Sequence, residues 1–215
     1  MVAAAALIAA LVAWSLHSER RQTYRYKLSV EVDTKLGLRS GSAVREVKYN
    51  HTWPKLPDMA GATAKQRGEA VIIDLPGGET LFALVPVDAY RILQAAFGDD
   101  SAATLDTATA EGRVRDLDIP TSCADDDCRG FPRFVTFTDP LDPTSMKRLN
   151  LGELVAGSPT GVSLKRVTVQ MVEEEVTRAI AKRLPWLTRK EQFRTVADNP
   201  FTSTLPPEVG SLQIE

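Results

Sequence analysis

The stretch from Tyr24 to Asp33 alternates strictly between apolar and polar side chains, and no other stretch constrains the fold as strongly. One parity is aromatic or aliphatic, while the other carries a charge or a hydroxyl group. Successive side chains of a strand point to opposite faces, so the pattern predicts a strand with one buried and one solvated face. The side chains expected to be buried are Tyr24, Tyr26, Leu28, Val30 and Val32.

An uncharged segment from Val2 to Leu16 precedes this strand. A transmembrane helix usually needs about 17 to 25 apolar residues, so the length is marginal. Trp14 lies where an interfacial anchor is expected, and Leu7 and Leu11 belong to the apolar body of the segment. No Lys or Arg precedes the segment and no small-residue cleavage site follows it, which disfavours a signal peptide. We predict a membrane anchor over residues 1–18; a buried helix of a soluble protein is the other alternative.

Cys123 and Cys128 lie in one polar loop, separated by four residues. Outside the cytoplasm the simplest interpretation is a disulfide closing a small loop, whereas in the cytosol the two residues would more often be free thiols. Arg20 and Arg21 follow the apolar segment, and the positive-inside rule would keep them in the cytoplasm. That rule weakens for long translocated domains, so we expect the folded domain outside the cytoplasm.

The chain has 215 residues, 43% of them hydrophobic, and a formal net charge of −2. This size fits one domain with appendages or two small domains. Near-neutral charge argues against electrostatically driven nucleic-acid binding, although composition does not exclude a basic patch in the folded domain.

The remaining patterns predict an α+β fold with a mostly antiparallel sheet and two or three short helices, preceded by one N-terminal transmembrane helix. The soluble domain is expected at 19–187 with a polar insert at 99–130, followed by a C-terminal tail at 188–215. Turn residues fill 34–42, a bulge is expected where Val44 and Arg45 interrupt the alternation, and 54–68 is interpreted as a loop. Further strands are predicted at 43–53, 69–75, 80–85, 131–138 and 161–172, and helices at 88–97, 150–156 and 173–184, with a brief helix around 101–111.

No catalytic, cofactor-binding or metal-binding residue is predicted. His51 sits on a predicted strand and has the chemistry of a general base, but a lone strand histidine is more often a packed or surface residue. Asp125, Asp126 and Asp127 suit a hard cation, yet the loop lacks the EF-hand pattern and is better interpreted as solvated. The chain has no Gly-x-Ser-x-Gly or phosphate-loop motif.

Four segments carry a resemblance to known sequences: residues 24–32, 68–75, 137–145 and 182–187. They resemble predicted proteins from proteobacteria that have a short N-terminal anchor and one small domain, with no assigned activity. The resemblance implies a protein of the bacterial inner membrane with a periplasmic domain, and it brings no catalytic residue. A fainter likeness is carried by residues 37–44, which are similar to the Gly-Leu-x-x-Gly-x-x-Val step of lipid-shuttling MCE domains.

These features favour a membrane-anchored envelope protein that binds a partner or assembles into a larger complex. Its expected partners are the lipid bilayer, through the N-terminal helix, and another protein; no nucleic acid and no cofactor is expected. The alternatives are an envelope hydrolase or transferase, which lacks a convergent nucleophile and base in the sequence, and an MCE-like lipid carrier.

Overall fold

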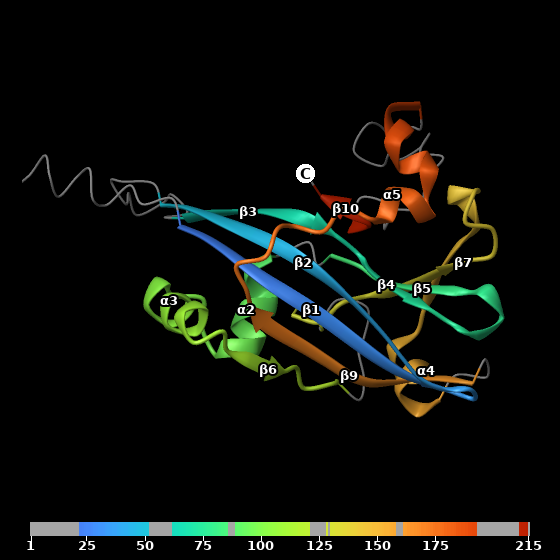
Figure 1. Cartoon of the computed structure of the whole chain (residues 1–215), viewed down its shortest axis with the longest axis horizontal. Coiled ribbons are helices and arrows are strands. Elements are labelled where there is room, and N and C mark those ends of the chain that lie inside the picture. The colour runs from blue at the N-terminus through green and yellow to red at the C-terminus, as the bar shows by residue number, and fades with distance from the viewer. Residues whose placement is uncertain are drawn as a thin grey trace, which may run out of the picture.

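The computed structural model describes residues 22–51, 62–85, 89–120, 128, 130–157, 161–192 and 211–214. Over these residues the chain is α+β, and every strand pair is antiparallel (Figure 1). The predicted fold class is therefore confirmed in its coarse form. The predicted anchor at 1–18, with Leu7, Leu11 and Trp14, lies outside the described residues. No helix in the described part of the chain has the length and apolar character to cross a membrane.

Two sheets make up the body. The larger has the order β10-β3-β2-β1-β9-β6, and the smaller has the order β4-β5-β7-β8. The strands of the larger sheet are β1 (Gln22–Thr34), β2 (Gly37–His51), β3 (Ala62–Glu69), β6 (Val114–Asp116), β9 (Val162–Met171) and β10 (Gln213–Ile214). Those of the smaller sheet are β4 (Val71–Asp74), β5 (Thr80–Ala83), β7 (Phe134–Phe137) and β8 (Met146–Leu149).

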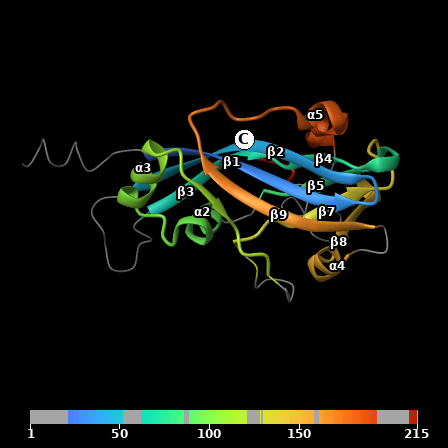
Figure 2. The same ribbon diagram turned by 60° about the horizontal axis from the view of Figure 1, so that its bottom comes forward.

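Short helices connect and cover the sheets. In Figures 1 and 2, α2 and α3 lie toward the end of the larger sheet where β1 begins, and α4 lies toward the β1–β2 turn. The α-helices are α2 (Ala89–Phe97), α3 (Ala102–Ala110), α4 (Leu151–Ala156) and α5 (Ile180–Arg183). Single 3-10 turns or longer 3-10 segments are η1 (Pro76–Gly78), η2 (Pro143–Ser145) and η3 (Pro185–Gln192).

The β1–β2 hairpin is the longest unit of the fold. Its register is unbroken from Gln22 opposite Tyr49 to Thr34 opposite Gly37. The inner parity of β1 is buried along its whole length, so the predicted alternation is confirmed. The expected turn over 34–42 is confirmed at Lys35 and Leu36 but is wrong for residues 37–42, because β2 already begins at Gly37. The expected bulge at Val44 and Arg45 is also wrong: the register irregularity lies in the β1–β9 pair, at Glu31 and Val32.

The two sheets approach each other closely at Gly41. A Cβ atom at this position would lie 2.0 Å from the carbonyl oxygen of Ile72 on β4. Gly41 is thus a strand residue that lets β4 pass over β2, and not the turn residue that the sequence suggested.

The smaller sheet follows directly from the larger one. Ala70 alone separates β3 from β4, and η1 then turns the chain into β5. The predicted strands at 69–75 and 80–85 form the antiparallel pair β4–β5, and β5 is buried along its length, as expected for a strand covered on both faces. The predicted loop over 54–68 is wrong for Ala62–Gly68, which belongs to β3, and β8 forms where no strand was predicted.

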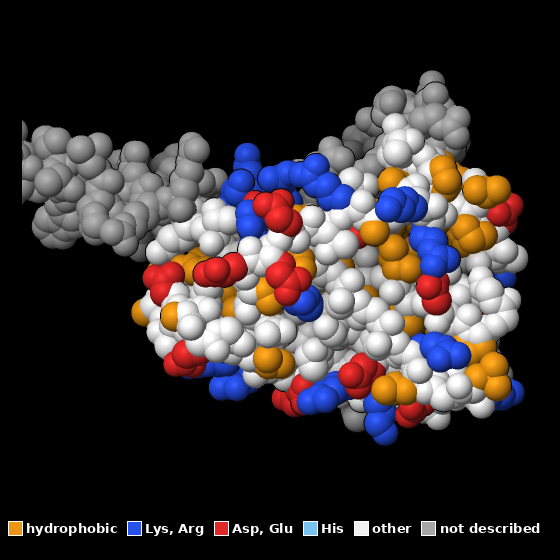
Figure 3. All heavy atoms as spheres, in the orientation of Figure 1, with side chains coloured by type: hydrophobic (Ala, Val, Ile, Leu, Met, Phe, Trp, Pro, Cys, Tyr) orange, Lys and Arg blue, Asp and Glu red, His pale blue; other side chains and the backbone are white. Residues whose placement is uncertain are grey.

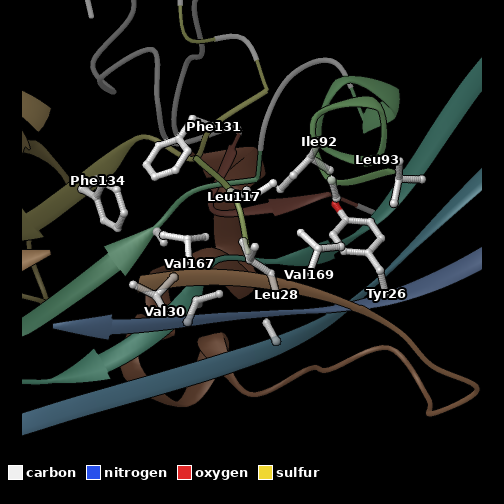
Figure 4. Close-up of a cluster of buried hydrophobic side chains, with 14 of the residues drawn as sticks. Tyr26, Leu28, Val30, Ile92, Leu93, Leu117, Phe131, Phe134, Val167 and Val169 are labelled. Carbon is white, nitrogen blue, oxygen red and sulfur yellow. The ribbon is translucent and has the colours of Figure 1, made fainter. Parts of the chain in front are cut away.

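The main core fills the space between the two sheets and beneath α2, α3 and α4. Figure 4 shows side chains of β1 and β9 meeting Ile92 and Leu93 of α2 and Phe134 of β7. A second core lies on the other face of the smaller sheet, where α5 and η3 cover it. Trp186 and Leu187 belong to this second core, and both are 4% exposed.

Helices α2, α3 and α4 form where the sequence predicts them, and Ser101 and Asn150 accept backbone hydrogen bonds as N-caps of α3 and α4. The predicted helix over 173–184 is wrong for its first half. Residues 173–179 cross the sheet without helical structure, and only Ile180–Arg183 is helical.

Candidate functional site

Lys and Arg side chains gather on the outer face of the larger sheet, at the end where β1 begins. They lie on the parity opposite the core residues, on the adjacent strands β1, β2 and β3. Figure 3 shows Lys and Arg atoms concentrated over β2 and β3. We call this group the basic surface; it consists of Arg25, Lys27, Lys48, Lys65 and Arg67.

A single carboxylate lies at the centre of the basic surface. Glu46 accepts a hydrogen bond from Arg25 Nε at 2.9 Å, and lies 3.3 Å from Lys48 Nζ and 3.8 Å from Arg67 Nη1. Its side chain is only 4% exposed. Burial raises the pKa of Glu46, but the hydrogen bonds and charges of Arg25 and Lys48 outweigh burial, so the net pKa lies below its ordinary value.

The strand register also forces two like charges together. Lys48 of β2 lies directly opposite Lys65 of β3. Directly opposed like charges destabilise a sheet, because nothing between them offsets the repulsion except solvent and nearby anions. The fold therefore holds more positive charge on this face than Glu46 can balance.

A segment without regular structure, Val172–Ala179, bounds the basic surface; we call it the crossing segment. It leaves β9 and runs over the outer face of β1 and β2 toward α5 (Figure 1). Thr177 exchanges two hydrogen bonds with the backbone of Val44, and Glu174 pairs with Lys27. The predicted role of Glu173–Glu175 as a helix N-terminus is thus wrong, because these residues lie on the crossing segment.

A second buried carboxylate fixes the end of the crossing segment. Glu69 accepts backbone N–H bonds from Ala179 and Ile180 at 2.8 to 2.9 Å. Beside it Arg45, 1% exposed, donates from Nε to the Glu69 carbonyl and from Nη2 to the Ala83 carbonyl, both at 3.0 Å. Burial lowers the pKa of Arg45, and the nearby Glu69 charge favours the charged form. Arg45 thereby joins β2 of the larger sheet to β5 of the smaller one.

Gly68 makes room for this arginine. It has a φ of +147°, and a Cβ there would lie 2.8 Å from Cγ of Arg45. This is also where β3 leaves β2, since the last β2–β3 pair is Glu46 with Arg67. The Arg45 network is enclosed by backbone on both sides, so we interpret it as structural.

Three tyrosines of the hairpin point toward α2 and α3. Tyr24 donates its hydroxyl to Asp106 of α3 at 2.9 Å, and its ring meets Tyr49 edge-on at 5.9 Å. Burial, followed by the neighbouring carboxylates Asp106 and Asp100, raises the pKa of Tyr24 and Tyr49 well above the ordinary value. Both hydroxyls stay protonated at neutral pH, and that of Tyr24 holds α3 against the hairpin.

The opposite end of the body exposes leucines. Leu36 in the β1–β2 turn is 71% exposed, Leu38 at the start of β2 is 51% exposed, and Leu141 in the β7–β8 turn is 71% exposed. Both turns lie on the side away from the start of β1 (Figure 1): the β1–β2 turn lies toward α4, and the β7–β8 turn lies beside Trp186 of η3, which donates to the Pro140 carbonyl. Figure 3 shows hydrophobic atoms at both places. We call Leu36, Leu38 and Leu141 the apolar end.

The residues singled out from the sequence are not brought together. Cys128 packs against the main core, but Cys123 lies outside the described residues, so the predicted bridge stays a prediction. Asp125, Asp126 and Asp127 also lie outside them. His51 ends β2. The MCE-like step over 37–44 lies inside one continuous strand, β2.

The sequence predicts neither the basic surface nor the apolar end. Lys65 and Arg67 fall in a stretch interpreted as a loop, and Leu36 and Leu38 in a stretch interpreted as a polar turn. The signal available was the alternation of Lys65, Gln66, Arg67 and Gly68, but its inner parity carries too little apolar surface to indicate a strand. Within the described ranges, no group of three His, Cys, Asp or Glu side chains could hold a metal ion.

Comparisons with known proteins add no relative: no family model, no curated protein and no solved structure matches this chain.

Proposed function

We propose that this chain is a membrane-anchored envelope protein whose folded body binds a protein partner through the apolar end. One observation carries the proposal. Three of the four exposed large hydrophobic side chains of the described residues lie at the end opposite the start of β1. Single exposed leucines need no explanation, but three on the same side of the body favour a broad contact surface that spans both turns.

The hairpin sets the distance between anchor and contact surface. β1 has 13 residues. At about 3.3 Å per residue, its turn lies about 40 Å from the point where the chain enters the sheet. A body anchored at residues 1–18 would therefore present the apolar end about 40 Å from the anchor, where a partner could reach it.

The energy available limits how the apolar end is used. Burying a leucine fully contributes about 1.5 to 3 kcal/mol, so these three partly buried leucines contribute about 4 kcal/mol together. A micromolar complex needs about 8 kcal/mol beyond the cost of association. The leucines would thus be the centre of an interface that other contacts complete.

Photocrosslinking in native membranes tests the apolar end. A photoreactive residue at Leu36 or Leu141 should give an adduct of one defined mass, whereas the same residue at exposed Ala103 of α3 should not. The double substitution L36D/L38D should abolish the adduct at position 141. Equal adducts at Ala103, or none at positions 36 and 141, would contradict the proposal.

Fractionation tests the anchor. The intact protein should remain with membranes after a high-salt wash, and L7R/L11R should release it into the aqueous fraction because charged residues at the centre of a span are costly. Intact protein in the aqueous fraction would overturn the anchoring.

A further inference from the structure

The basic surface carries unbalanced positive charge. Its five cations face two paired carboxylates, Glu46 and Glu174, and the exposed Glu173 and Glu175 lie at its border on the crossing segment. Glu46 is shared among three cations, so none of them is fully neutralised. The opposed pair Lys48 and Lys65 adds a repulsion that a purely structural surface would gain nothing from keeping.

The charged groups are available to a partner. The side chains of Arg25, Lys48 and Arg67 are 33%, 44% and 41% exposed, and Lys65 is exposed as well. Their stems lie on the sheet while part of each side chain reaches water, the arrangement that suits contact with an anionic surface.

The chain's own covalent order places this surface near the predicted bilayer. The uncharged segment ends at Leu16 and β1 begins at Gln22, so five residues separate them. Five residues span at most about 17 Å. Two of these residues are Arg20 and Arg21, which extend the positive charge along the sequence.

We propose that the basic surface docks on the anionic lipid headgroups of the membrane that holds residues 1–18. This inference rests on the anchoring in the proposed function. Basic groups next to a membrane span are drawn to anionic lipid, and each contributes modestly. The anchor makes such weak contacts sufficient, because it converts docking into an intramolecular event at high effective concentration. A soluble polyanion would gain no such effective concentration, and the small excess of positive charge alone would have to hold it. We therefore favour anionic lipid over a soluble polyanion.

Lysine modification in vesicles tests the docking. The full-length protein is reconstituted in phosphatidylcholine vesicles, either alone or mixed with phosphatidylglycerol, and treated with a water-soluble acetylating reagent. Mass spectrometry follows Lys48 and Lys65, with exposed Lys147 and Lys165 as internal references. We expect acetylation of Lys48 and Lys65 to slow roughly tenfold in the anionic vesicles, the references to stay unchanged, and high salt to remove the protection.

A matched pair of variants separates the surface from general charge. K65Q should reduce the protection of Lys48 several-fold, and K147Q, which removes an exposed lysine of β8, should not. Loss of protection in both variants would overturn the assignment to this surface.

Flotation with neutral vesicles at high salt separates this inference from the anchoring. Flotation with equal acetylation in both lipids would overturn the docking and leave the anchor standing. Protection in anionic vesicles without flotation on neutral ones would support the docking and overturn the anchor. Protection by duplex DNA with none by anionic vesicles would overturn the lipid assignment in favour of nucleic acid.

Discussion

Glu46 and Glu69 are buried on adjacent strands of the larger sheet, β2 and β3, yet their carboxylates have different partners. Glu69, 2% exposed, accepts from the backbone N–H groups of Ala179 and Ile180, and its own carbonyl accepts from Arg45, which also donates to the Ala83 carbonyl. Glu46, 3% exposed, is surrounded by three side-chain cations that also reach solvent.

The difference lies in what surrounds each charge. Around Glu69, every partner is fixed by the backbone, so the charge specifies how the crossing segment and the two sheets meet. Around Glu46, the partners are three flexible cationic side chains. One carboxylate neutralises only one positive charge, so positive charge remains for an external ligand. Burial alone thus does not separate a structural charge from one that serves binding; the nature and number of the partners does.

The largest expected effect is at Arg45. R45M should lower the free energy of unfolding by about 3 to 5 kcal/mol, because it leaves the buried backbone carbonyls of Glu69 and Ala83 without their donor and removes the positive charge near the Glu69 carboxylate. Urea unfolding at neutral pH measures the loss. R39M, at an exposed arginine of the same strand, is the control and should stay within about 0.5 kcal/mol of the wild type. A loss below about 1 kcal/mol for R45M would refute the structural role.

Glu69 should have the next largest effect. E69A removes the acceptor of two buried N–H groups and should cost about 2 to 3 kcal/mol. Hydrogen exchange should accelerate at the Ile180 amide before it does in β1, since the crossing segment loses its attachment. E79A, in the exposed turn before β5, provides the comparison. Unchanged exchange at Ile180 would show that the crossing segment is held by Thr177 instead.

The sequence predicts the parts of the fold whose stability comes from an apolar face. The alternation from Tyr24 to Val32 identifies β1 because its inner side chains all enter the core. β3 escapes detection because Ala64, Gln66 and Gly68 offer little to bury, and pairing with β2 holds the strand instead. The crossing segment has helical spacing at Val176, Ile180 and Leu184, but the long-range bonds to Val44 and Glu69 override it.

The basic surface could not be predicted for a related reason. Its residues come from strands about forty positions apart in the chain, and a near-neutral composition hides a local excess of charge. Arg45 interrupts the alternation of apolar and polar residues in β2. A buried arginine and a bulge both produce this interruption, so the sequence alone does not separate them. Only the register of β2 against β1 and β3 distinguishes them.

Glu46 should have a smaller effect that depends on pH. Its folded pKa lies below the ordinary value of about 4.3, so its stabilising contribution is present above that pH and is lost as pH falls through the folded pKa. E46Q should therefore cost about 1 kcal/mol at neutral pH, and the gap to the wild type should narrow at an acidic pH below the ordinary pKa of a glutamate. Urea unfolding at both pH values, with E153Q on α4 as control, measures it.

The same substitution sharpens the contrast with Glu69. E46Q adds net positive charge to the basic surface, so it should strengthen protection of Lys65 by anionic vesicles while it weakens the fold. E69A should weaken the fold without strengthening that protection. An equal gap for E46Q at both pH values, or weaker protection, would place Glu46 in the same structural class as Glu69.

The smallest expected effect, at Lys65, has the opposite sign. K65Q removes the repulsion between Lys65 and Lys48, so it should raise the free energy of unfolding by a few tenths of a kcal/mol. The gain should shrink at high salt, because screening already weakens the repulsion in the wild type. Urea unfolding at low and high salt measures it, against K147Q as control. If K65Q gains stability and anionic vesicles no longer protect Lys48 from acetylation, Lys65 contributes to membrane contact and destabilises the fold. If K65Q loses stability, the charge of Lys65 stabilises the sheet, which contradicts the prediction.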